Sequence, residues 1–224
     1  MNTTIQRTVA QHPLFEHLQD RQMERLLQLA TYKKFSRNEP VFMPCEPSDN
    51  VYILLEGSIK LGAISVEGRE VIKHILYPTA LFGEMGLVGE EMRHDFAIAL
   101  ERENAVLAIP TADFRRFVHT DYVLTIKIMN AIGSRLRTAE HKLESMVFKD
   151  ARSRIIEFLK ETASKRGRRV GLETLIRNHL TQQDIADLTG TSRQTVTTVL
   201  NELRSNNRIY FNRSKILIRD LATL

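Results

Sequence analysis

The stretch that decides the fold is residues 180–203, which read LTQQDIADLTGTSRQTVTTVLNEL. Thr181 is suited to cap a helix that begins at the next residue, and Asp184 three positions later completes a variant of the capping box. Gly190 follows the apolar residues of that helix and ends it, because glycine adopts a left-handed backbone at little cost. Ser192 then caps a second helix. The spacing predicts a helix-turn-helix, for which an ordinary helical hairpin is the alternative.

The predicted second helix has one apolar and one polar face. Its apolar positions predict a buried stripe of Val196, Val199, Leu200 and Leu203. On the polar face, the planar fork of Arg193 fits O6 and N7 of guanine, and Gln194 fits an adenine edge. Two short β runs, 208–211 and 215–219, predict a hairpin wing with cations at its tip. The candidate DNA contacts are Thr181, Ser192, Arg193, Gln194, Thr197, Thr198, Arg213 and Lys215, with a solvated surface as the alternative for each cation.

Positive charge is concentrated in the last third of the chain. Residues 151–224 carry 14 Lys and Arg against 7 Asp and Glu, an excess of seven positive charges. Residues 1–150 carry 18 against 20, so the whole 224-residue chain has a net charge of +5. This asymmetry predicts a polyanionic partner for the C-terminal part alone. Double-stranded DNA fits the motif, and an anionic membrane surface is the alternative.

Residues 32–110 contain short runs rich in β-branched and aromatic residues. The runs are 51–55, 59–65, 70–76, 96–100 and 105–109, and turn residues separate them. Many short strands at this spacing predict an antiparallel barrel or jelly roll. Before them, leucines within residues 12–30 recur at helical intervals and predict a short N-terminal helical element.

From residue 112 onward the periodicity is helical, and no proline follows. Apolar residues recur seven apart in two rows, which is typical of the a and d positions of a coiled coil. A parallel homodimer is therefore predicted, with packing of the helix on its own domain as the alternative. Residues 150–180 predict one more helix, followed by a basic loop at 165–171. The predicted dimer seam consists of Met129, Ile132, Leu136, Ala139, Leu143 and Met146.

Composition excludes several classes of protein. Cys45 is the only cysteine, so one chain cannot form a disulfide, a cysteine zinc site or a four-cysteine iron–sulfur cluster. No apolar run is long enough for a membrane span or a signal peptide, and a cytoplasmic protein without a membrane partner is predicted. The seven histidines lack metal-binding spacing, and no Gly-rich phosphate loop occurs. We therefore expect no catalytic residue, no metal site and no enzyme activity.

The whole chain resembles the Crp/Fnr family of bacterial transcription regulators. Three segments carry the likeness: DNVYILLEG at 49–57, FGEMGL at 82–87 and TSRQTV at 191–196. The resemblance implies an α+β fold with an antiparallel β-roll (a jelly roll) and N-terminal helices in residues 1–111. A dimerisation helix at 112–148 and a winged helix-turn-helix at 149–224 would follow, with a hinge near Phe148–Ala151. It also implies a homodimer on a pseudo-palindromic operator, a small effector in the roll, and RNA polymerase as a partner.

The recognition helix departs from the usual family pattern. The family commonly reads DNA with an Arg-Glu pair at the start of this helix and with a later Arg. Here Gln194 stands in place of the acid, and Thr198 stands where the later Arg often lies. The resemblance therefore implies an altered half-site.

An effector site is implied around the Gly-Glu pair at 83–84. Cyclic-nucleotide binders of the family hold the cyclic phosphate with backbone N–H groups there, the ribose hydroxyl with the Glu, and the phosphate again with a later Arg-Ser pair. This chain has His94-Asp95 at the place of that pair and Arg93 one residue early. An aspartate facing a phosphate would repel it, which disfavours a cyclic nucleotide, although a one-residue bulge would bring Arg93 into place. The candidate effector residues are Gly83, Glu84, Met85, Arg93, His94 and Asp95.

Other sensors of the family fit less well. The iron–sulfur branch needs several cysteines, and the haem branch needs axial ligands, for which His74 on a predicted strand is a weak candidate. Some members work without an effector. The alternative function is a cyclic-nucleotide-binding regulatory module that docks on another protein, and the basic helix-turn-helix argues against it.

Overall fold

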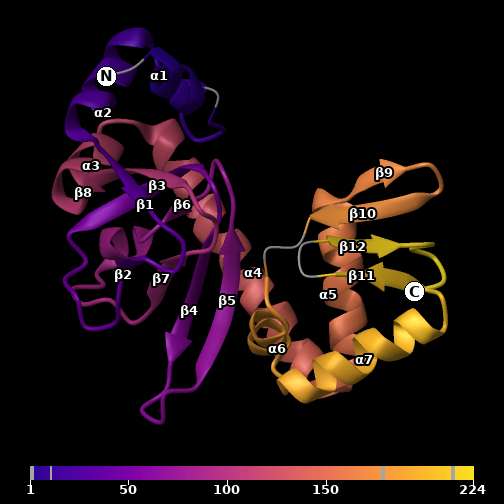
Figure 1. Ribbon diagram of the computed structural model, residues 1–224. Coiled ribbons are helices and arrows are strands. Elements are labelled where there is room, and N and C mark those ends of the chain that lie inside the picture. The colour runs from indigo at the N-terminus through magenta and orange to yellow at the C-terminus, as the bar shows by residue number, and fades with distance from the viewer. Residues whose placement is uncertain (1–2, 11, 178–179, 213–214) are drawn as a thin grey trace. The chain divides into compact units, whose positions relative to one another are not determined.

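A computed structural model describes residues 3–10, 12–177, 180–212 and 215–224. Internal contacts divide the chain into two compact units, one up to Thr138 and one from Ala139 onward. The boundary falls inside the long helix α4 (Tyr122–Phe148) (Figure 1). The predicted α+β fold is confirmed. Among the described residues, no helix combines the length and the apolar character needed to cross a bilayer.

Two four-stranded antiparallel sheets form the roll of the first unit. The first sheet has the order β1 (Thr31–Phe35), β8 (Asn104–Pro110), β3 (Asn50–Glu56) and β6 (Leu81–Phe82). The second has the order β2 (Pro40–Phe42), β7 (Phe96–Ala99), β4 (Ile59–Ile64) and β5 (Glu70–Leu76). All strand pairs are antiparallel, as predicted for a jelly roll. The five predicted runs are β3, β4, β5, β7 and β8, whereas β1, β2 and β6 were not predicted.

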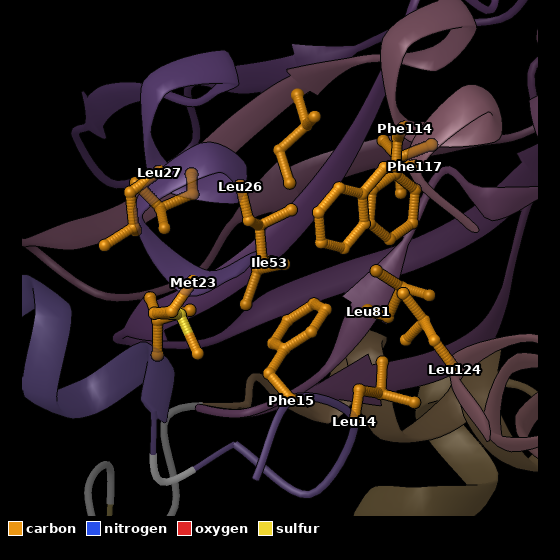
Figure 2. Close-up of a cluster of buried hydrophobic side chains, with 14 of the residues drawn as sticks. Leu14, Phe15, Met23, Leu26, Leu27, Ile53, Leu81, Phe114, Phe117 and Leu124 are labelled. Atoms are coloured by element: carbon orange, nitrogen blue, oxygen red, sulfur yellow. The ribbon is translucent and has the colours of Figure 1, made fainter. Parts of the chain in front are cut away.

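Strand β3 is buried on both faces because its sheet lies between two layers. Tyr52 and Leu54 join the core between the two sheets. Val51 and Ile53 point the other way and join a core shared with the helices, since successive side chains of a strand alternate. Figure 2 shows this second core, with Ile53 close to side chains from the helical layer.

The helical layer of the first unit consists of α1 (Thr3–Ala10), α2 (Asp20–Leu29), α3 (Thr111–His119) and the start of α4. The predicted element at 12–30 is helical only from Asp20 onward. Before it the chain makes turns, where the Leu14 amide donates to Nδ1 of buried His12 at 3.0 Å. The helical stretch predicted from residue 112 is two helices. Asp121 separates them and caps α4, because its Oδ1 accepts from the Leu124 amide at 2.9 Å.

The second unit contains the end of α4, the helix α5 (Ala151–Arg166) and a four-stranded antiparallel sheet. The strand order is β11 (Ile209–Phe211), β12 (Lys215–Ile218), β10 (Glu173–Arg177) and β9 (Arg168–Val170). The loop predicted at 165–171 is wrong in part, because Arg168–Val170 is a strand that turns into β10 at Gly171, whose φ is +63°. Helices α6 (Gln182–Thr189) and α7 (Arg193–Ser205) lie between β10 and β11 in the chain.

Candidate DNA interface and effector site

The helix-turn-helix is confirmed, and its caps are those predicted. Oγ1 of Thr181 accepts from the Asp184 amide at 3.1 Å, and the Asp184 carboxylate accepts from the Thr181 amide at 2.7 Å. Gly190 ends α6 with a φ of +60°. Oγ of Ser192 accepts from the Thr195 amide at 3.0 Å and so begins α7. Both helices are therefore fixed at their N-termini by their own side chains.

The predicted stripe of α7 is buried, which leaves the opposite face of this helix free. The four stripe residues are at most 5% exposed. Arg193, Gln194 and Thr198 are exposed on the other face. Asn201 lies one turn further along the same face and is also exposed, although it was not among the predicted contacts. The sequence could have predicted this position, because residues seven apart on a helix share a face and Asn201 follows Gln194 by seven residues.

The candidate hydroxyls differ from Arg193 and Gln194 in having partners within the protein. Thr181 donates to the Asp184 carboxylate at 2.7 Å, and Thr198 donates to the Gln194 carbonyl at 3.0 Å. Oγ1 of Thr197 lies 2.7 Å from Oε1 of Gln182 on α6. The side chains of Arg193 and Gln194 make no hydrogen bond or ion pair with the residues described. Among the predicted contacts on α7, these two side chains are therefore the ones whose polar groups have no partner in the described part of the chain.

The wing contains a pair of facing cations. Arg213 lies outside the described residues. Lys215 begins β12, and its register partner on β10 is Arg177. Both are exposed, and neither side chain has a hydrogen bond or ion pair within the described part of the chain. Like charges directly opposite each other destabilise a sheet, so this placement favours an anion there. Arg177 was not predicted, because its strand was not.

Gly83 forms the turn at which the effector site was predicted. Its φ of +71° starts a short 3₁₀ helix, η1 (Glu84–Val88). A Cβ on Gly83 would lie 3.1 Å from Nη1 of Arg93 and 3.1 Å from the Asn50 carbonyl oxygen. Only glycine fits there, because the backbone is left-handed and the surroundings are close.

Arg93 reaches this turn and is 3% exposed. Its Nη1 donates to the Gly83 carbonyl at 2.9 Å, and its Nη2 donates to the Asn50 carbonyl. The guanidinium carbon lies 4.4 Å from the centre of the Phe42 ring. Burial lowers the pKa of Arg93, and the nearby Tyr52 and Glu90 oppose this shift.

Glu84 is also buried, at 4% exposure, and pairs with a residue from α4. Nη1 of Arg135 donates to Oε1 of Glu84, and Nη2 of Arg135 donates to the Leu81 carbonyl. Oε2 of Glu84 is buried and has no hydrogen-bond partner among the described residues. Arg135 was not predicted as a partner, because it lies outside the two apolar rows of the predicted seam.

The other predicted effector residues do not join this cluster. The His94 side chain is 85% exposed, and its Nδ1 lies 3.1 Å from Oε1 of Glu90. Asp95 pairs with Lys73 at 2.6 Å. Met85 is 46% exposed. The structure thus brings together Gly83, Glu84 and Arg93, and engages His94 and Asp95 elsewhere.

These residue types fit a cyclic nucleotide in part. An acidic group and a guanidinium are present at the head of the η1 turn, as such a ligand needs. Both are already bound to protein groups, Glu84 to Arg135 and Arg93 to two carbonyls. A ligand that uses Arg93 has to replace those carbonyls, which lowers its net affinity. The described residues contain no cluster of three His, Cys, Asp or Glu suited to a metal ion.

The predicted dimer seam is partly exposed on α4. Met129, Leu136 and Leu143 are 60–65% exposed, and Ala139 is exposed as well. Ile132 differs, because it is half-buried and packs against the core of the first unit. Met146 is 45% exposed and lies near the helix-turn-helix, since a Cβ on Gly190 would be 3.0 Å from its methyl carbon.

Two comparisons with known sequences agree with this geometry. The chain matches the family model of the cyclic nucleotide-binding domain over residues 32–121 and that of the Crp-like helix-turn-helix domain over residues 153–224. It is 28% identical over 190 residues to the CRP-like cAMP-activated global transcriptional regulator of Mycobacterium tuberculosis, covering 85% of this chain and 84% of that protein. It is 28% identical over 192 residues to the global nitrogen regulator of Nostoc sp., covering 85% and 86%.

A solved structure supports the same fold. FixK2 from Bradyrhizobium japonicum is similar with a TM-score of 0.77 and 22% identity, covering 87% of this chain and 94% of that one. The sequence and structure matches agree on a roll followed by a helix-turn-helix.

Proposed function

The chain belongs to the Crp/Fnr family of transcription regulators, and we propose that it binds a pseudo-palindromic operator as a homodimer. Residues 1–111 would bind a small effector, residues 112–148 would form the dimer, and residues 149–224 would bind DNA. The two α7 helices of the dimer would enter successive major grooves, one helical turn apart. We further propose a cytoplasmic location, no enzyme activity and RNA polymerase as the protein partner.

The observation that carries this proposal is the free polar face at the start of α7. Arg193 and Gln194 are exposed, lack protein partners among the described residues, and project from a helix whose other face is buried. Helix-turn-helix proteins present base-reading side chains from this part of the second helix. The buried stripe holds the helix rigidly, so the two side chains are placed before DNA arrives.

Phosphate contacts would come from the facing cations Arg177 and Lys215 of the wing sheet. A phosphate next to both would convert a repulsive pair into two attractive contacts. The excess of seven positive charges in residues 151–224 supports the same partner.

Dimerisation would use the exposed apolar face of α4. Met129, Leu136 and Leu143 recur seven apart, and Ile126 and Val147 are also exposed at 36% and 69%. Ile126 lies three residues before Met129, and Val147 lies four residues after Leu143. These offsets of three and four are those of the second row of a coiled-coil seam. Because Ile132 packs within its own chain, we propose that Ile126 and Val147 replace Ile132 and Met146 in the seam.

The sensing role would use the cluster of Gly83, Glu84 and Arg93. Relatives include a cAMP-activated regulator, so cyclic AMP is the first ligand to try. The local contacts argue that any affinity is weak, because Glu84 and Arg93 already have protein partners.

The experiment that tests the proposal is a selection from a random duplex library by the purified protein, with and without cyclic AMP. We expect enrichment of a two-fold-symmetric site in the absence of the nucleotide. Failure to enrich any site under both conditions would contradict the proposal. The alternative is a regulatory module that docks on another protein, and salt dependence distinguishes it from a DNA binder. A DNA binder loses affinity for duplex DNA steeply as the salt concentration rises. A protein-docking module does not bind duplex DNA at all.

A further inference from the structure

One arginine connects two helix ends in the second unit. Arg154 lies in the first turn of α5 and is partly buried. Its Nη1 donates to the Lys149 carbonyl at 2.7 Å, just after the end of α4. Its Nε donates to the Thr189 carbonyl at 2.8 Å, and its Nη2 donates to the Gly190 carbonyl at 3.0 Å. The three acceptors belong to the joint between α4 and α5 and to the turn between α6 and α7.

The chemistry of these acceptors explains why an arginine is present. The last carbonyls of a helix have no partner within the helix and carry partial negative charge. Arg154 meets such carbonyls at the ends of two different helices. Its planar guanidinium offers donors in fixed directions, so one side chain can hold both ends at once. A lysine has a single ammonium on a flexible stem and cannot reproduce this bridge.

Further side-chain contacts within the same unit stabilise the joint at Phe148–Ala151. Glu157 of α5 accepts from Lys149 Nζ at 2.5 Å and from Ser145 Oγ at 3.1 Å. Asp150 caps α5, because its Oδ1 accepts from the Ser153 amide at 2.7 Å. The methyl group of Met146 lies over Gly190. The last turns of α4 therefore group with the DNA-binding part, as the division after Thr138 also indicates.

We propose that Arg154 is a positioning residue that ties the helix-turn-helix turn to the end of α4, so that the direction of α7 follows that of α4. The proposal rests on the DNA-binding function proposed above. It adds to the expectation of a hinge near Phe148–Ala151, because side chains hold this joint to both neighbouring helices. A dimer held along α4 would thereby fix the spacing of its two recognition helices.

The test compares Arg154→Lys and Arg154→Met with Arg152→Met. Arg152 is the matched control, because it lies on the same helix and its guanidinium pairs with the side chain of Glu202 on α7 at 3.0 Å rather than with a helix-end carbonyl. Affinity is measured for the selected operator and for a scrambled duplex, below the lowest melting temperature of the set. We expect both Arg154 variants to lower the operator-to-scrambled ratio about tenfold, as expected when hydrogen bonds that position a helix are lost. Arg152→Met should leave this ratio unchanged.

Hydrogen exchange gives a second readout without DNA. Amides in residues 190–192 should exchange faster in Arg154→Lys than in the wild type, while those in the middle of α5 should not change. If Arg154→Lys keeps the wild-type ratio of operator to scrambled-duplex affinity, the proposal is wrong, because a positive charge at residue 154 is then sufficient. If Arg154→Met lowers both affinities equally, as a lost phosphate contact does, the proposal is also wrong. Failure of the wild type to prefer any operator would instead contradict the proposed function.

Discussion

Arg177 and Lys215 lie directly opposite each other on neighbouring strands β10 and β12. Both are exposed cations, and neither side chain makes a hydrogen bond or ion pair with the residues that the structure describes. A folded protein alone gains nothing from this arrangement, because like charges across a sheet repel. Substitution of one of these residues should therefore change DNA binding without lowering the stability of the free protein.

We expect Arg177→Met to weaken DNA binding while leaving the free protein as stable as before or slightly more stable. Loss of one phosphate contact should reduce the slope of log K against log salt by about 0.9 for operator and scrambled DNA alike. Lys165→Met is the control, because it removes the same charge from the exposed end of α5. An unchanged slope in Arg177→Met, or a loss confined to one base position, would show that Arg177 does not contact the backbone.

Arg193→Ala should lower affinity for the operator by about 1–3 kcal/mol and relax the preference at one base position. The reason is that Arg193 is exposed at the start of α7 and free to form a bidentate contact with a base edge. Competition against operators substituted at each position measures this effect. A uniform loss across all sequences would instead indicate a phosphate contact.

Leu136→Asp should dissociate the homodimer, because it places a charge in the middle of the exposed seam of α4. Ile132→Ala should behave differently and lower the free energy of unfolding, since Ile132 packs against the core of its own chain. Sedimentation separates the two effects. A Leu136→Asp protein that stays dimeric would show that the seam lies elsewhere.

Arg135→Met should destabilise the first unit by about 2–4 kcal/mol, because it leaves the buried carboxylate of Glu84 without its cation. The double variant with Glu84→Gln should recover part of this loss, and urea unfolding of the four proteins gives the coupling. Arg137→Met, two residues further along α4 and exposed, is the control. Additive losses in the double variant would mean that the pair contributes no coupling energy.

The stability of the first unit should depend on pH through His12. Burial lowers the pKa of His12 from 6.5 to about 4, against a smaller opposing effect of the Thr79 backbone. Between these values the unfolded chain binds the proton and the folded chain does not. Stability is therefore complete above pH 6.5 and falls as pH drops toward 4, by up to about 3 kcal/mol. Urea midpoints of the wild type should show this decline, His12→Gln should lack it, and His94→Gln at an exposed histidine should keep it.

The sequence predicted the parts of this fold whose pattern is local. The caps of α6 and α7, the stripe of α7 and the strands β3, β4, β5, β7 and β8 of the roll all follow from short-range spacing. The missed strands β1, β2 and β6 have no such pattern: β1 is an exposed lysine-containing edge, and β2 and β6 have three and two residues. Their pairing with distant strands, rather than their own residues, makes them strands.

The effector site shows the same limit. The positions of Gly83 and Glu84 were predicted from a motif, but the partner of Glu84 is Arg135, which is 51 residues away. Arg93, and not His94-Asp95, reaches the turn, because the backbone geometry between Gly89 and Phe96 decides which side chain points inward. A count of residues along the chain cannot supply that choice.

The capped helix-turn-helix has a consequence for how quickly the protein finds its site. Thr181, Asp184, Gly190 and Ser192 complete both helix ends without a ligand. The two capped helices therefore need no folding step when the protein meets DNA. Binding costs the protein rigid-body freedom and some side-chain freedom, but little backbone entropy. Encounter should then be limited by diffusion and by attraction between the basic surface and the duplex, and differences between DNA sequences should appear mainly in how long the complex lasts.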